Sequence, residues 1–174
     1  MGTTLDSAKT PQDKLTVQFH IEIKHEFQNI SKHKRVRMPV VKCSMPLYIN
    51  GSLLDEREVF VESVFFQSLL QPGKFPMFTF TCGIFGCGGY YVDVLHNDTT
   101  VTWITEQSPF MDASDESSNV FIFSWSNLLN FAEELIRGYE EIARVRLAHN
   151  LQYNNDLELY RNIIHRKRIE VDRA

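Results

Sequence analysis

The chain has 174 residues, of which 43% are hydrophobic and 12% aromatic, enough for one folded domain with a large core. It contains 18 Lys and Arg against 22 Asp and Glu, a net charge of −4. Nucleic acid is therefore disfavoured as the main partner, because its binders usually carry a basic excess. No run of 18 apolar residues occurs, so we expect no membrane span.

The beginning of the chain is polar and lacks regular patterning. We expect residues 1–13 to form a flexible arm and residues 14–174 to form a single domain. The opening residues lack the apolar segment of a secretion signal. Three cysteines are an odd number for a framework of disulfides. These features predict a cytoplasmic protein.

Two contrasting segments follow the arm. Residues 15–24 alternate between apolar and polar side chains, which predicts one half-buried antiparallel strand. Residues 25–37 are polar and basic and are expected to be a connection without regular structure. The basic run from Lys32 to Arg37 is interpreted as a solvated turn, and contact with an acidic partner or nucleic acid is the alternative.

Prolines and a hairpin signal mark the next segment. Residues 38–49 are predicted to be a strand or a strand pair broken at Pro39 and Pro46, since proline cannot donate to a strand ladder. Asn50 and Gly51 follow directly. This dipeptide predicts a two-residue hairpin turn, because both residue types tolerate a positive φ.

The middle of the chain contains a mixed segment and three strand patterns. Residues 55–71 combine helical spacing with strand-favouring residues, and we favour a helix that ends before Pro72. Residues 75–81, 90–95 and 100–106 are predicted to be three strands of an antiparallel meander. One face of this sheet is expected to carry four large apolar side chains: Phe78, Phe80, Val92 and Trp103.

The last third of the chain is predicted to be mostly helical. After a short strand at residues 120–123, Ser124 is expected to cap a long helix over residues 125–148, and a shorter helix is expected at 155–168. The predicted fold is therefore α+β. It consists of an antiparallel sheet of five to seven strands covered on one face by helices.

The most unusual stretch is TCGIFGCGGYYVDV, residues 81–94, in which Cys82 and Cys87 lie among four glycines. We favour a tight glycine turn with the cysteines as small buried hydrophobic residues. A thiol pair and a metal site are alternatives. The metal candidates are Cys82, Cys87, Cys43 and His96, with zinc as the metal. No other cofactor is expected.

Three motifs carry a resemblance to a known group. They are Y-I-N-G-x-L-L at residues 48–54, F-T-C-G-x-x-x-C-G-G-Y-Y-V-x-V at residues 80–94 and V-x-W at residues 101–103. In this order they resemble small uncharacterised bacterial proteins with an N/D-G hairpin, a Cys-Gly turn and a strand ending in Trp. The resemblance implies a bacterial cytoplasmic protein, and it implies no activity.

The sequence favours a binding protein over an enzyme. G-x-S-x-G, H-E-x-x-H and P-loop patterns do not occur. We therefore expect a non-enzymatic protein that binds another protein, as small immunity or antitoxin-like proteins do. One alternative is a metal- or thiol-dependent protein that uses Cys82 and Cys87. Another is a small-molecule binding module with a pocket lined by Phe65, Tyr90 and Trp103.

Overall fold

The structure is a computed structural model that describes residues 13–80, 88–112 and 118–174. Within these residues it contains ten strands and three helices, and the α+β prediction is confirmed. The strands are β1 Leu15–Val17, β2 His20–Ser31, β3 Lys34–Ser44, β4 Leu47–Ile49, β5 Ser52–Leu53, β6 Glu58–Phe60, β7 Gly73–Phe80, β8 Gly89–His96, β9 Thr100–Thr105 and β10 Val120–Ser124. The helices are α1 Glu62–Leu70, α2 Trp125–Ala148 and α3 Leu157–Arg173.

The main sheet has the strand order β10-β9-β8-β7-β6, and every neighbouring pair is antiparallel. Its three central strands form the predicted meander. Val94 of β8 lies opposite Trp103 of β9, and alternate residues of both strands are buried, as a half-buried sheet requires. Phe78, Val92 and Trp103 are buried on one face of the sheet, as predicted. Phe80, at the end of β7, was predicted on the same face but is 37% exposed.

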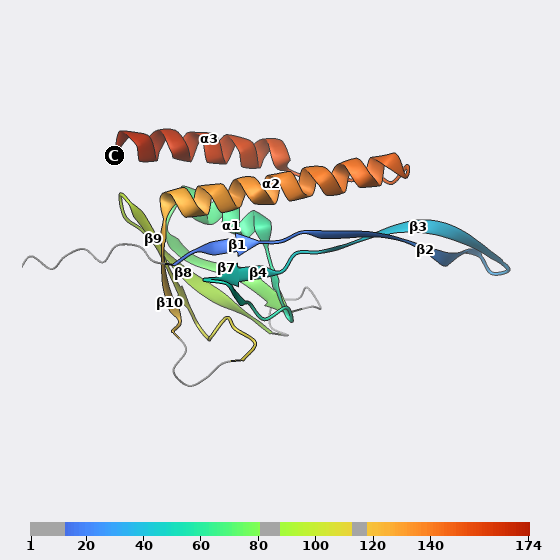
Figure 1. Ribbon diagram of the computed structural model, residues 1–174, viewed down its shortest axis with the longest axis horizontal. Helices are drawn as coiled ribbons and strands as arrows, with labels where there is room; N and C mark the ends of the chain where they lie inside the picture. The colour runs from blue at the N-terminus through green and yellow to red at the C-terminus, as the bar shows by residue number, and fades with distance from the viewer. Residues whose placement is uncertain (1–12, 81–87, 113–117) are drawn as a thin grey trace, which may run out of the picture.

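Helices cover the buried face of the main sheet in two layers. Phe65 of α1 meets Trp103 of the sheet with ring centroids 6.3 Å apart and Phe131 of α2 at 5.2 Å. Tyr160 of α3 stacks on Phe66 of α1 at 4.0 Å, so α3 packs against the outer side of the first helical layer. Figure 1 shows α2 and α3 lying together on this side of the sheet.

The helix ends follow the expected local chemistry. The hydroxyl of Ser124 accepts a hydrogen bond from the backbone N–H of Asn127 at 3.0 Å, which confirms the predicted cap of α2. Helix α1 is shorter than the predicted 55–71, because the first part of that segment forms strand β6. The strand-favouring residues and the helical spacing in this segment therefore belong to two separate elements.

A second sheet has the order β1-β4-β5 and contributes Leu15 and Ile49 to the same core. Asn50 and Gly51 have φ angles of 53° and 80°, so the predicted hairpin turn between β4 and β5 is confirmed. Of the predicted arm, residues 1–12 lie outside the described residues. The carboxylate of Asp13 accepts a hydrogen bond from the backbone N–H of Ile122 at 2.7 Å.

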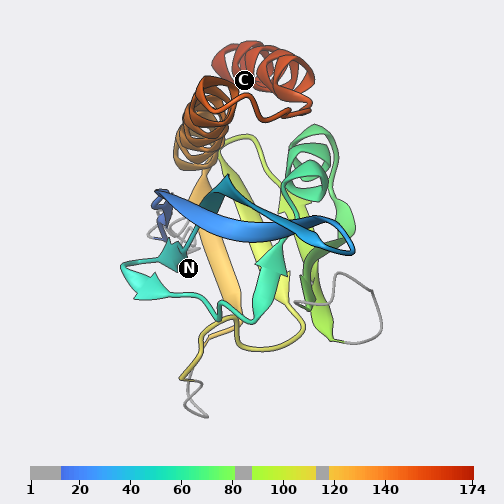
Figure 2. The same ribbon diagram turned by 90° about the vertical axis from the view of Figure 1, so that its right-hand side faces the viewer.

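A long two-stranded ribbon, residues 20–44, is formed by β2 and β3 with a turn at Lys32 and His33. The prediction that residues 25–37 are a connection is wrong, and the predicted strand 15–24 is divided into β1 and the beginning of β2. The ribbon extends beyond the end of α2 in Figure 1, and Figure 2 views it from its tip. Alternation of apolar and polar residues did not reveal these strands, because most of the ribbon is exposed to solvent on both faces.

Candidate functional site

The ribbon is fixed to the body of the protein at its base. Phe19, just before β2, lies over Gly138 of α2, and its ring fills the space that a Cβ of residue 138 would occupy. The same ring meets Tyr139 edge-on at a centroid distance of 5.7 Å. The Tyr139 hydroxyl also donates a hydrogen bond to the sulfur of Met45, just after β3, at 3.5 Å. Helix α2 therefore holds both ends of the ribbon.

The half of the ribbon nearest the body is balanced in charge. Lys24 pairs with Glu22 at 3.3 Å, and Lys42 pairs across the strands with Glu26 at 2.6 Å. The hydrogen bond from Lys42 holds the pKa of Glu26 below its usual value. These exposed pairs stabilise little on their own, but they leave little unbalanced charge in this half.

The far half of the ribbon, residues 27–37, has a different character, and we call it the distal ribbon. It contains no acidic residue and four basic ones, which we call the tip cations: Lys32, Lys34, Arg35 and Arg37. Among the residues that the structure describes, no ion pair engages any of the four. Phe27 and Ile30 are 65% and 59% exposed in the same segment. Charge and apolar surface are thus presented together to solvent.

Strand register places several of these side chains next to one another. Phe27 lies directly opposite Arg37, and Asn29 lies directly opposite Arg35. Residues directly opposite each other share a face of the ribbon, and so do residues two positions apart along a strand. Phe27, Asn29, Arg35 and Arg37 therefore form one continuous patch, in which the Arg35 guanidinium lies 6.0 Å from the centre of the Phe27 ring.

The charges of the chain are strongly segregated. Residues 20–44 contain six Lys and Arg and two Asp and Glu, so the ribbon carries a net charge of +4. The other residues contain twelve basic and twenty acidic side chains, a net charge of −8. The total of −4 hides this separation, which matters because a local field, rather than the total charge, attracts a charged partner.

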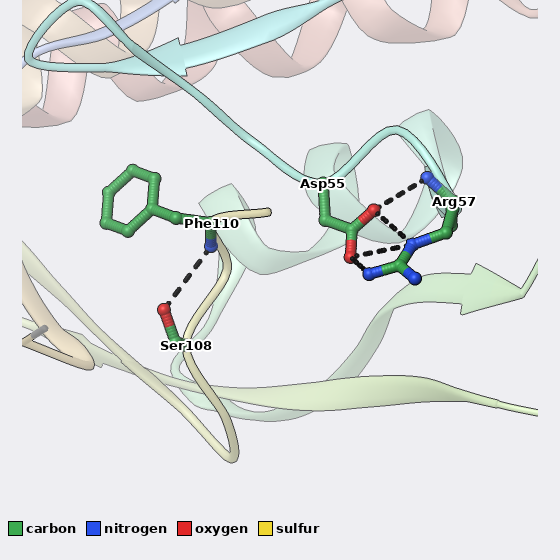
Figure 3. Close-up of polar contacts among 4 residues, drawn as sticks. All are labelled: Asp55, Arg57, Ser108 and Phe110. Atoms are coloured by element: carbon green, nitrogen blue, oxygen red, sulfur yellow. Dashed lines mark hydrogen bonds and ion pairs between the residues drawn. The ribbon is translucent and has the colours of Figure 1, made fainter. Parts of the chain in front are cut away.

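A pocket of ≈ 330 Å³ lies at the base of the ribbon, bordered by Cys43, Asp55, Glu58 and Phe78. Arg57 holds the Asp55 carboxylate with two side-chain nitrogens at 2.7–3.2 Å, and these bonds lower the pKa of Asp55. Figure 3 shows this fork, with the loop that carries Ser108 and Phe110 nearby. One carboxylate oxygen of Glu58 is buried without a hydrogen-bond partner among the described residues.

The structure does not bring the two described metal candidates together. Cys43, whose side chain is exposed, borders the pocket at the ribbon base, and partial burial raises the pKa of its thiol. His96 borders another pocket with Trp125 and Lys167. Cys82 and Cys87 lie outside the described residues. Across residues 13–80, 88–112 and 118–174, no group of three or more His, Cys, Asp or Glu is arranged to hold a metal ion.

No family model, curated protein or solved structure matches this chain. The resemblance to small bacterial proteins, the metal or thiol site at Cys82 and Cys87, and the cytoplasmic location remain predictions. In the part of the chain that the structure describes, no helix is both long enough and apolar enough to cross a bilayer.

The three aromatic residues of the predicted small-molecule pocket lie in the core. Phe65 and Trp103 are in edge contact, and Tyr90 stacks on Phe78 at 4.7 Å. All three are almost completely buried. The ribbon, in contrast, was missed. Ile21, Ile23 and Phe27 lie on one face of β2, but His25 interrupts their alternation and most residues of the strand are exposed, so the pattern did not reveal the ribbon.

We expect His96 to make the protein less stable as the pH falls below 6.5. Its Nε2 lies 2.8 Å from the Ser68 carbonyl oxygen, so the neutral ring donates a hydrogen bond there. Burial is the largest cause that lowers the pKa of His96 below 6.5, and the charge of Lys167 adds to it. The unfolded chain therefore takes up the proton first, and stability present above pH 6.5 is lost as the pH falls towards the folded-state pKa.

Urea unfolding at about pH 7.5 and about pH 5 checks this expectation. The comparison is between the natural protein and His96→Gln, whose amide N–H can still reach the Ser68 carbonyl. The natural protein should lose more stability than the variant on acidification. An equal loss in both would show that His96 does not contribute to the acid sensitivity.

Proposed function

We propose that this protein is a non-enzymatic binding protein whose contact element is the ribbon and whose partner presents a negatively charged surface. The observation that carries the proposal is the distal ribbon, in which four cations without acidic neighbours stand beside exposed Phe27 and Ile30. Sequence analysis predicted a protein partner, and an acidic protein would satisfy this proposal.

Two features of the ribbon support this role. An isolated two-stranded hairpin is only marginally stable in water, so contacts made by a partner would stabilise the distal part. The base is held by α2 through Phe19 and Met45, which fixes the position from which the ribbon projects. The body then serves as a scaffold that presents the ribbon.

Retention on immobilised heparin, a polyanion, tests the proposal. The natural protein should be retained at low salt despite its net charge of −4, because the tip cations lie away from the acidic body. A tip variant with all four tip cations changed to Gln should pass through unretained.

A body variant provides the matched control. It changes four exposed cations outside the ribbon to Gln: Arg57, Arg144, Arg166 and Arg173. Both variants lose four positive charges and have the same net charge, so only the position of the loss differs. The body variant should still be retained. Equal behaviour of the two variants, or no retention of the natural protein, would contradict the proposal.

A further inference from the structure

We propose that the partner of the distal ribbon is double-stranded DNA, and that the ribbon enters the major groove. This inference rests on the proposed function and names the partner. It is carried by the shape of the ribbon, by the side chains that share one of its faces, and by the distribution of charge over the molecule.

The shape of the ribbon matches that groove. The major groove of B-DNA is about 12 Å wide and admits a two-stranded ribbon. Strand β2 has 12 residues and β3 has 11, which corresponds to a ribbon about 40 Å long at about 3.3 Å per residue. Its far half extends past the end of α2, so the tip can enter a groove while the body remains outside (Figure 1).

One face of the distal ribbon carries side chains suited to base edges. Arginine pairs with guanine, asparagine with adenine, and an aromatic ring contacts the thymine methyl group. Arg35, Arg37, Asn29 and Phe27 share this face. Two residues along a strand rise about 6.6 Å, close to two steps of a DNA strand at about 3.4 Å each. Arg35 and Arg37 can therefore address bases two steps apart.

The other tip cations suit the phosphate groups. Lys32 lies in the turn, and Lys34 begins β3 on the face opposite to that of Arg35. Phosphate groups border the major groove on both sides, and base edges form its bottom. A ribbon with cations in its turn and on both faces can therefore contact phosphates and base edges at the same time. The rest of the chain carries a net charge of −8, which disfavours contacts with phosphate away from the ribbon.

Two other anionic partners fit these observations less well. The major groove of an RNA duplex is deep and narrow and does not admit such a ribbon. An acidic protein would satisfy the four cations, but it gives no role to the amide of Asn29, which lies opposite Arg35 on the same face.

Fluorescence anisotropy with the full chain and a labelled DNA duplex of about 20 base pairs tests the inference. With Lys32 and Lys34 on phosphate groups, about two contacts, log K should fall against log salt with a slope of about −2. The tip variant should lose binding and the body variant should keep it. A duplex whose cytosines carry bulky glucosyl groups in the major groove should also lose binding.

Three results would overturn the inference. They are equal binding of an RNA duplex, equal binding of polyglutamate as a model of an acidic protein, and undiminished binding of the glucosylated duplex. If heparin retention depends on the tip cations but the DNA duplex does not bind, the inference fails and the proposed function stands. If neither polyanion binds, both fail.

Discussion

Replacing Phe65 with Ala should lower the free energy of unfolding by about 3–5 kcal/mol, the range for a large aromatic side chain removed from a packed core. Phe65 has 0% exposure and lies where α1, α2 and the main sheet meet. It contacts four aromatic rings at centroid distances between 5.2 and 6.3 Å: Phe60, Phe66, Trp103 and Phe131. The cavity would be bordered by all three elements, so no single side chain can refill it.

Urea unfolding followed by tryptophan fluorescence measures this loss, since Trp103 lies beside the new cavity. Phe27→Ala is the matched control, because it removes the same atoms from a side chain that is 65% exposed. The control should change stability by less than about 0.5 kcal/mol. A loss below about 1 kcal/mol in Phe65→Ala would mean that the contact between helices and sheet is not a tightly packed core.

The second large effect is expected from Gly89→Ala at the beginning of β8. Gly89 has a φ of 87°, and a Cβ at this position would overlap the carbonyl oxygen of Phe78 on the neighbouring strand. The clash is with backbone, so it cannot be relieved by rotating a side chain. We expect a loss of about 3 kcal/mol from strained φ and displaced strands together.

Gly51→Ala separates these two causes. Gly51 has a similar φ of 80°, but a Cβ there would have no atom within 4 Å. This control should lose only the cost of the strained backbone, about 1–2 kcal/mol. Thermal unfolding of both variants gives the comparison. Equal losses would show that β7 and β8 separate easily at Gly89, contrary to the close approach described above.

The sequence predicted those elements whose pattern arises from burial. The meander alternates because one sheet face is covered, and α2 follows helical spacing because one side meets the core. Ser124 and the turn at Asn50 and Gly51 were predicted from local chemistry, which does not depend on the rest of the fold. For the helix cap and the turn, the residues that determine the local structure lie within a few positions of one another.

The ribbon could not be recognised by the same criteria. A solvated strand is free to carry polar residues on both faces, so the segment around His33 has the composition of a loop. Its charge separation was also hidden, because net charge is a sum over the whole chain. Only pairing of β2 with β3 shows that Arg35, Arg37 and Asn29 share one face. The candidate site therefore required the structure.

The position of positive charge at one end of a largely acidic molecule has a consequence for its motion in solution. Such a molecule is an electric dipole, and the field of a nearby polyanion exerts a torque on it before any contact forms. The ribbon is turned to face the polyanion and the body is turned away. Encounters are therefore oriented in advance, and their rate should fall steeply once added salt shortens the range of the field to about 10 Å.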